Sequence, residues 1–394
     1  MSRIKLIDLP NLPLTETYSQ TFNGINSSSY DAELFFDPKT GLVSLDNDLA
    51  KVSYNEKSYN YRTNSFAGNV SRDLQRFIEF VKFVEVNLEI NPKRIIEIGG
   101  NDLTLAKALH DDYEKLIVID PLAPKDFKDK RFKKINSLSQ YDSAVDFSSF
   151  NDEANLIISR HTIEHIKDPS SHFKKLSEEL NYDNVYVYEF PDIRQLINSL
   201  RFDAIFHQHI SYFDVYSFIK YINTFGFEVI TMRLNTLGSC GGSTQIAFTK
   251  KKLNKKLTKN EIANFAYPVL SNDEFISYFR KLHTFYRSVC DNLINQIEYS
   301  NLPLCGYGAA LMLPTFFYHT GIDPNYLDCI YDDDPQKKGL TYTNVPLKIL
   351  APDPTLKEYD WNCLITSLES YRPIYRAVSS KYSPKRIYSL SSVS

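Results

Sequence analysis

Glycine is scarce in this chain, at 13 of 394 residues, or about 3% where globular proteins average about 7%. A chain with so few glycines is expected to keep them where the backbone needs a positive φ or a close approach. Seven of them fall into three groups: Gly99 and Gly100; Gly238, Gly241 and Gly242; Gly306 and Gly308. These groups mark the segments in which we look first for tight turns and ligands.

Paired cysteines and long apolar runs are also missing. The five cysteines are scattered and form no CxxC pair, which excludes a zinc site built on cysteine pairs. Unpaired thiols fit a reducing cytoplasm. No run approaches the 18 or so apolar residues of a membrane span, and the first residues lack the apolar core of a signal peptide. We therefore expect a cytoplasmic protein without a membrane partner.

No excess of charge of either sign is present. Lys and Arg total 45, and Asp and Glu total 48, for a formal net charge of −3. This balance argues against a nucleic-acid partner, which normally requires a basic surface. The 27 tyrosines and 26 phenylalanines are the one marked excess. We expect some of these rings to line a sugar-sized cleft and most of them to lie in the core or on the surface.

Apolar patterning predicts an α/β fold in three parts. Residues 1–70 are polar and weakly periodic, and we expect a small cap that is irregular or rich in β-strand. Residues 71–90 have helical spacing with Ser71 as the N-cap. Short apolar strands then alternate with helical segments in 71–250, and again in 251–394, which is typical of parallel sheets built from βαβ units. A lysine-rich stretch at 250–260 marks the expected boundary between the two halves.

The first glycine group lies between an apolar strand and a helix, in RIIEIGGNDLTLAKAL. Glu97 is near the end of the strand, Gly99 and Gly100 form the turn, and Asp120 ends the next strand at the position that contacts ribose hydroxyls in doubly wound nucleotide folds. Asp102 in the turn would repel a pyrophosphate but attract a cation. This chemistry favours S-adenosylmethionine, which carries a sulfonium and no phosphate, over NAD.

EIGGND followed by VIDP resembles motifs I and II of class I methyltransferases, and SRHTIEHIKDP at 159–169 resembles the segment that follows them. Three later blocks resemble deoxysugar C-methyltransferases, which act on nucleotide-linked keto-sugars. These are EFPDIRQLINSLRFDAIFHQHISYF, GSCGGSTQIAF, and GYGAA with YDDDPQKKG. The order of the blocks also matches, over roughly residues 50–350. The resemblance implies a Rossmann-like methyltransferase core, a second C-terminal α/β domain, and His161 as a further cofactor-binding residue.

The segment IFHQHISYF holds two histidines two positions apart, His207 and His209. In an extended strand they would face the same way. Methylation of a carbon beside a ketone needs a base that removes its proton, and histidine is suited to that step near neutral pH. The resemblance implies that His209 is this base. Gln208 and His165 are the neighbouring catalytic candidates, and Phe206 is a candidate for substrate binding. A structural role for each histidine is the alternative, and for Glu164 we expect a capping or packing role.

The chain departs from the family at several positions. The family's YHEH is FHQH here, so Phe206 lacks a hydroxyl and Gln208 lacks a charge. The histidine of the family's HGGS block is replaced by Cys240. The N-terminal cysteines that bind zinc in the family are missing, so we expect no zinc. A lysine of the C-terminal AAKG block is also missing, which weakens the expectation of a nucleotide there.

Two further groups are candidates for the substrate. Tyr59 and Tyr61 lie in SYNYRTNSF, where the resemblance places a substrate-lining block; packing of the cap is the alternative. Tyr61 is also a catalytic candidate. In the C-terminal half, Gly306, Tyr307 and Gly308 form a second strand–turn–helix motif, which either binds substrate or serves as scaffold.

The sequence thus predicts a methyltransferase that uses S-adenosylmethionine to methylate a sugar, at carbon of a nucleotide-linked keto-deoxysugar, with His209 as the base. One alternative is transfer to oxygen or nitrogen of a surface-polysaccharide precursor. Another is a binding protein that kept the fold and lost turnover. We expect a small-molecule substrate and a monomer or weak homodimer.

Overall fold

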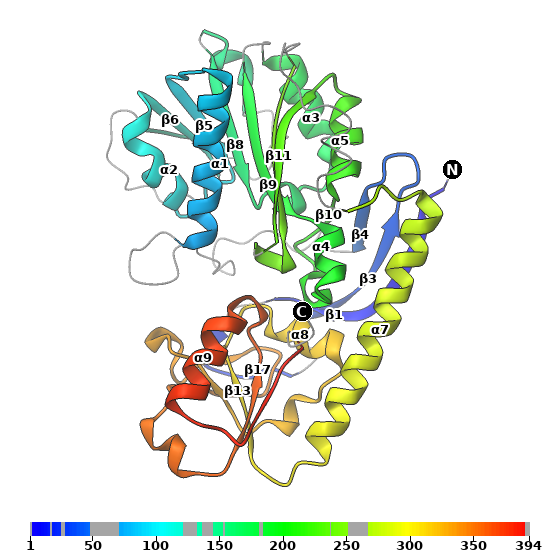
Figure 1. Cartoon of the computed structure of the whole chain (residues 1–394), viewed down its shortest axis with the longest axis vertical. Helices are drawn as coiled ribbons and strands as arrows, with labels where there is room; N and C mark the ends of the chain where they lie inside the picture. The colour runs from blue at the N-terminus through cyan, green and yellow to red at the C-terminus, as the bar shows by residue number, and fades with distance from the viewer. Residues whose placement is uncertain are drawn as a thin grey trace.

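The computed structural model describes residues 2–15, 18–24, 28–47, 71–120, 132–135, 145–152, 154–180, 184–236, 238–250 and 267–390. Figure 1 shows an upper lobe and a lower lobe, each with a sheet and covering helices. The N-terminal strands lie beside the junction of the lobes, and the long helix α7 (Asn272–Glu298) runs along them into the lower lobe.

The N-terminal cap is an antiparallel sheet, as a β-rich cap would be. It consists of β1 (Ile4–Pro13), β3 (Ser29–Phe36) and β4 (Val43–Asn47), and its edge is completed by β10 (Ser211–Tyr212) from the middle of the chain. A second contact is made by β2 (Tyr18–Ser19), which pairs with β15 (Thr341–Tyr342) of the lower lobe. The cap is therefore hydrogen-bonded to both lobes.

The upper lobe is built on a seven-stranded sheet in the order β11-β12-β9-β8-β5-β6-β7. The strands are β5 (Arg94–Ile98), β6 (Lys115–Ile119), β7 (Phe132–Ile135), β8 (Asn155–Arg160), β9 (Val185–Pro191), β11 (Glu228–Asn235) and β12 (Ser243–Thr249). β12 runs in the opposite direction to the other strands of this sheet. The chain starts at the centre with β5 and moves outward in both directions, so the ends of β5 and β8 mark the point where the strand order reverses. Ligands of doubly wound sheets bind at this point.

Helices cover both faces of this sheet. On one face, α1 (Arg72–Leu88) and α2 (Thr104–Leu109) pack in a single apolar cluster. On the other face, α3 (Pro169–Glu179) and α5 (Val215–Asn223) pack in an aromatic-rich cluster. The Ser71 hydroxyl accepts a hydrogen bond from the Leu74 N–H at 3.1 Å, so the predicted N-cap of α1 is confirmed.

The lower lobe holds a five-stranded parallel sheet in the order β16-β14-β13-β17-β18. Its elements are β13 (Leu304–Tyr307), α8 (Leu313–Thr320), β14 (Ile330–Tyr331), β16 (Ile349–Leu350), β17 (Asn362–Ile365), α9 (Tyr371–Lys381) and β18 (Arg386–Tyr388). The predicted fold class, a Rossmann-like α/β core with a second α/β domain and an N-terminal cap, is confirmed.

Short helical segments connect these elements. They are α4 (Ile193–Asn198) and the 3₁₀ turns His110–Asp112, Phe147–Phe150, Ile163–His165, Phe202–Ala204, Ser239–Gly241, Pro324–Tyr326, Pro335–Lys337, Pro354–Glu358 and Leu368–Ser370. Within the described ranges, no helix combines the length and the apolar character needed to cross a membrane. The expected domain boundaries at 70 and 250 adjoin residues outside the described ranges, so they stay predictions.

Candidate active site at the ends of the central strands

The turn after β5 contains the two glycines that the sequence singled out, and the chain's own packing requires both. Gly99 has φ +83°, and a Cβ there would lie 2.0 Å from the Thr162 Oγ1. A Cβ at Gly100 would lie 2.3 Å from the Val118 Cγ1. Real Cβ atoms do not approach other atoms so closely, so the strand, turn and following helix can pack at this distance only with glycine.

The acidic residues around this turn fix its backbone. The Asn101 N–H donates to the Asp120 Oδ2 at 2.9 Å, so the tip of β6 holds the turn after β5. The Asp102 Oδ1 accepts bonds from the Thr104 N–H at 3.1 Å and from its hydroxyl at 2.7 Å, at the start of α2. The structure thus brings four of the predicted cofactor residues, Gly99, Gly100, Asp102 and Asp120, to one edge of the sheet.

The Glu97 carboxyl lies beneath this turn and is almost fully buried. Its Oε2 has no hydrogen-bond partner, and a Cβ at Gly100 would lie 3.1 Å from that oxygen. Burial, with the charges of Asp120 and Asp102, raises the pKa of Glu97 to about 8. A nearby cation would stabilise the ionised form of Glu97 and so offset the effects of burial, Asp120 and Asp102 on its pKa. This orphaned carboxyl, with the cradle that the glycines keep open, fits a cofactor that carries a sulfonium and no phosphate.

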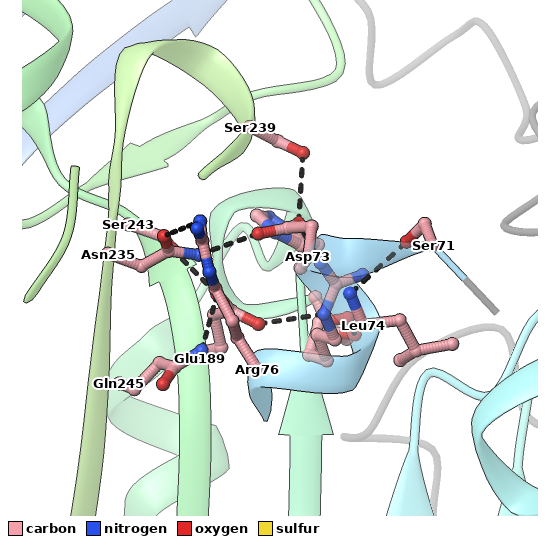
Figure 2. Close-up of polar contacts among 12 residues, drawn as sticks. Ser71, Asp73, Leu74, Arg76, Glu189, Asn235, Ser239, Ser243 and Gln245 are labelled. Carbon is pink, nitrogen blue, oxygen red and sulfur yellow. Dashed lines mark hydrogen bonds and ion pairs between the residues drawn. The ribbon is translucent and has the colours of Figure 1, made fainter. Parts of the chain in front are cut away.

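A polar network ties the start of α1 to the neighbouring strand ends (Figure 2). Arg160 at the end of β8 forms ion pairs with Asp73 and with the buried Glu189, the latter at 2.7 Å. The Asn235 amide donates to the Asp73 Oδ1 at 2.6 Å, and the Arg76 guanidinium donates to the Asn235 Oδ1 at 3.1 Å. These residues could not be recognised from the sequence, because they come from α1, β8, β9 and β11 and share no local motif.

The same network surrounds His161, the remaining cofactor candidate. His161 has φ +49°, and its Nδ1 lies 3.3 Å from the Glu164 Oε1, while its Nε2 is buried without a partner. Burial works against protonation of His161, but Glu164 and Glu189 together raise its pKa. The strained backbone after β8 places His161 between the Glu189 network and Glu164.

The histidine segment is a turn, so the extended geometry in which His207 and His209 would face the same way is not present. The His209 N–H donates to the Phe206 carbonyl at 2.9 Å, which closes a turn over residues 206–209. The two histidines therefore point apart. The His207 Nε2 donates to the Leu12 carbonyl of the cap at 2.7 Å, whereas the His209 ring turns toward His165, with a centroid distance of 4.9 Å. His207 thus joins the cap to the core and lies away from the other catalytic candidates.

Gln208, which stands where the family has an acid, also turns to the cap. Its side-chain oxygen accepts a bond from the Thr15 hydroxyl at 2.7 Å, and its backbone carbonyl accepts one from the His165 Nδ1 at 2.8 Å. The lower lobe supports the same turn, because the His319 Nε2 donates to the Ile205 carbonyl at 2.8 Å. The Gln208 side chain is therefore a structural contact, and its backbone is what orients His165.

Glu164, His165 and His209 form a cluster of titratable groups at this edge. Each offers one nitrogen or oxygen atom, and these atoms all lie within 4.8 Å of one another. Burial opposes the ionisation of Glu164, but His161, His165 and His209 outweigh it and lower its pKa to about 2. Glu164 is therefore a carboxylate near neutral pH. We expected a capping or packing role for Glu164. Its neighbours His161 and His165 are close in the sequence, but its proximity to His209 depends on the fold.

His209 is neutral over the physiological range. Burial is the main cause that lowers its pKa to about 3, with a smaller contribution from His165. Its Nδ1 has no hydrogen-bond partner. The Phe206 ring lies against it, with a centroid distance of 4.1 Å, so the phenyl group that replaces the family's tyrosine packs directly on the predicted base.

The glycine turn of the lower lobe is explained by packing within that lobe. A Cβ at Gly306 would lie 2.9 Å from the Leu327 Cδ2, and one at Gly308 (φ +101°) would lie 2.4 Å from the Ser367 Cβ. Tyr307 is buried, and its hydroxyl donates to the Asp333 Oδ1 at 2.9 Å. These residues lie in the other lobe from His209. Tyr59 and Tyr61 lie outside the described residues.

Two family models match the chain. Residues 66–232 match a methyltransferase domain, and residues 239–375 match a C-methyltransferase C-terminal domain. No curated protein matches.

Solved structures similar to the chain include an S-adenosylmethionine-dependent methyltransferase from Clostridium acetobutylicum (10% identity, 45% of this chain, 92% of that one, TM-score 0.34). Another is the 1,6-didemethyltoxoflavin-N1-methyltransferase of Burkholderia thailandensis (10% identity, 46% and 79%, TM-score 0.34). Both TM-scores are below 0.5, so the assignment rests on the domain models. The chain is therefore a methyltransferase with a C-methyltransferase C-terminal domain.

Proposed function

We propose that this methyltransferase transfers a methyl group to a carbon beside the carbonyl of a nucleotide-linked keto-deoxysugar, with His209 as the base that removes the carbon-bound proton. The observation that carries the proposal is the orphaned Nδ1 of neutral His209 within a cluster that also holds the carboxylate of Glu164. The match of the second half to a C-methyltransferase C-terminal domain favours carbon as the acceptor.

The low pKa of His209 determines its protonation state before the reaction and the cost of protonating it. Because the ring is neutral near pH 7, its lone pair at Nδ1 is available for a proton in almost every molecule. The imidazolium formed would be costly in so buried a site, and the carboxylate of Glu164 offsets part of that cost. His165, held by the Gln208 carbonyl, positions the other side of the cluster.

We propose S-adenosylmethionine as the cofactor, which would supply an electrophilic methyl group on its sulfonium. In our proposal Gly99, Gly100 and Asp102 shape the turn that receives it, Asp120 contacts its ribose, and Glu97 and His161 supply polar groups beneath and beside it. Alignment of methyl and carbon contributes more to such a transfer than acid–base strength alone, because a positioned pair reacts without further loss of entropy.

For the substrate we propose Phe206 and Tyr59 on the sugar, with Tyr61 as a hydroxyl near the keto oxygen. Gly306, Tyr307 and Gly308 would face the nucleotide only at their backbone, because the Tyr307 ring is buried. Transfer to oxygen or nitrogen of a polysaccharide precursor is the second candidate, favoured by the Gln208 and Phe206 departures. The contact between Gln208 and Thr15 argues against this second candidate. Because Gln208 points to the cap, replacing the family's acid there removes no charge from the cluster of Glu164, His165 and His209.

The position of the new methyl group decides between the two candidates. We expect that incubation with a nucleotide-linked keto-sugar and methyl-¹³C-labelled cofactor gives a product whose labelled methyl couples to ring carbon protons in a heteronuclear NMR spectrum. The hydrolysed sugar should keep the label at the same carbon. A methyl signal at the chemical shift of an O-methyl ether, or a label removed with an amine, would contradict carbon transfer.

The raised pKa of Glu97 predicts a pH dependence of cofactor binding. Below pH about 8 the free protein holds a proton on Glu97, and a bound cation favours its release, so affinity for S-adenosylmethionine should rise with pH by up to about tenfold per unit and level off above pH 8. S-adenosylhomocysteine lacks the sulfonium charge and should respond far less. Calorimetry between pH 6 and 9 measures both.

Glu97→Gln is the matched variant, since it keeps the shape and removes the titration. It should flatten the pH dependence of S-adenosylmethionine toward that of S-adenosylhomocysteine. Equal slopes for both ligands in the unmodified protein would show that Glu97 does not sense the charge of the cofactor.

A further inference from the structure

The cluster of Glu164, His165 and His209 has the composition of a metal site. One donor atom from each residue lies within 4.8 Å of the other two. Glu164 is 3% exposed and His209 5%, and both the Glu164 Oε2 and the His209 Nδ1 lack a hydrogen-bond partner. A buried carboxylate oxygen and a buried imidazole nitrogen left unpaired are costly. Two such atoms in one cluster are what a cation would satisfy.

The second ring nitrogens fit the same interpretation. The His165 Nδ1 donates to the Gln208 carbonyl at 2.8 Å, so the lone pair of its ring is on Nε2. In the His209 ring, Nδ1 is a buried nitrogen without a hydrogen-bond partner. Histidines that bind metals commonly donate their other N–H to a carbonyl, which fixes the tautomer and the ring orientation.

The donor set selects the class of ion. Two imidazole nitrogens and one carboxylate oxygen suit Zn²⁺, which binds three such ligands and keeps a fourth position open at reactive sites. Mg²⁺ and Ca²⁺ prefer oxygen ligands. His165 is only partly buried, so the cluster has a side that faces outward.

A second cluster at the same edge has similar donor atoms, but its charges are already balanced by an arginine. Asp73, His161 and Glu189 also have donor atoms within 4.8 Å. There the Arg160 guanidinium pairs with both carboxylates, and the Glu189 Oε1 accepts bonds from Ser243 and Gln245. The protein itself supplies the cation in that cluster, whereas no arginine or lysine is paired with Glu164 among the described residues.

We propose that Glu164, His165 and His209 bind a divalent cation of the zinc class, and that the bound ion inhibits the enzyme by occupying the nitrogen that acts as base. The inhibitory half rests on the proposed function, because a lone pair given to the metal cannot accept the proton of the sugar. The binding half stands on the cluster alone. This proposal departs from the expectation of no zinc, which was based on the missing N-terminal cysteines; the site proposed here uses no cysteine.

The first experiment measures binding without activity. The full chain, stripped of metal with a chelator, is titrated with Zn²⁺ alone in a calorimeter. We expect one tight site per chain, weakened at least about tenfold by Glu164→Gln and by His165→Gln. Glu178→Gln, at an exposed position of α3, and His283→Gln on α7 are the matched controls and should leave the affinity unchanged. Unaltered affinity in both cluster variants would overturn the site.

Co²⁺ keeps the test valid if a variant folds poorly, because it reports the ligands of the unmodified protein. With nitrogen and oxygen ligands, bound Co²⁺ gives only visible absorption bands, and this is the spectrum we expect. A sulfur-to-metal charge-transfer band in the near ultraviolet would assign the bound ion to the free cysteines and overturn the proposal.

The second experiment tests inhibition. Metal-free enzyme with a nucleotide-linked keto-sugar in deuterated water should exchange a carbon-bound proton, stoichiometric Zn²⁺ should stop the exchange, and a chelator should restore it. Binding with undiminished exchange would overturn the inhibitory half. Absence of exchange in the metal-free enzyme would instead contradict His209 as base, and the binding data would still decide the site.

Discussion

His209→Gln should slow the exchange of the sugar's carbon-bound proton by about 10²- to 10⁴-fold, the range for loss of a general base. Glutamine fills a similar volume and can still pack on Phe206, but its amide has no lone pair that takes a proton at neutral pH. The measurement is the loss of the proton's NMR signal in deuterated water with a nucleotide-linked keto-sugar, without cofactor, so that methyl transfer does not enter the rate.

Two measurements separate a lost base from a lost fold. Calorimetric affinity for S-adenosylmethionine should stay within about threefold of the unmodified protein, because His209 lies outside the glycine turn. His283→Gln, which alters a histidine on α7, should exchange at the normal rate. If His209→Gln retains exchange, the base is another group, and the orphaned Nδ1 needs a different explanation.

Gly99→Ala is expected to abolish measurable binding of S-adenosylmethionine and to destabilise the protein. Two effects combine there: the left-handed φ of +83°, which costs about 1–2 kcal/mol for a residue with a Cβ, and a contact of 2.0 Å with the Thr162 Oγ1. Thr162 cannot yield easily, because it is buried and its hydroxyl bonds to the Ile98 and Arg160 carbonyls at 3.2 Å. Relief of the clash must therefore move the turn that receives the cofactor.

Gly226→Ala supplies a matched control. Gly226 has nearly the same φ, +82°, but a Cβ there meets nothing within 4 Å. In chemical denaturation, Gly226→Ala should lose only the stability that the positive φ costs. Its affinity for the cofactor should be normal. Thr162→Ala in the Gly99→Ala background removes the two nearest atoms and should recover part of the affinity. Equal behaviour of the two glycine variants would show that the clash with Thr162 is not the cause.

Local patterns predicted much of the upper lobe. The apolar run RIIEI, the Gly-Gly turn and the Ser71 cap each depend on neighbours within a few residues, so β5, its turn and the start of α1 are found where the sequence placed them. The same is true of Asp120, which follows a second apolar strand. Parallel strands bring their ends together, and the contact between Asp120 and Asn101 is a consequence of that rule.

The conformation of residues 206–209 and the contacts of their side chains could not be predicted in the same way. Whether FHQH is extended or turned depends on contacts with Leu12 and Thr15, nearly two hundred residues earlier in the chain. The proximity of Glu164 to His209 has the same origin, since the two residues are far apart in the sequence and meet only in the folded chain. Sequence resemblance identified His209 as important, but it could not show that Gln208 points elsewhere or that Glu164 faces the base.

The support of the His209 turn has a consequence for protein engineering. Residues 205–209 are held by the cap through Leu12 and Thr15 and by the lower lobe through His319. A chimera that exchanged the lower lobe to change substrate preference would also exchange the support of His209. Such a graft should keep a histidine at position 319, and selectivity should be redesigned on surfaces that do not contact the turn.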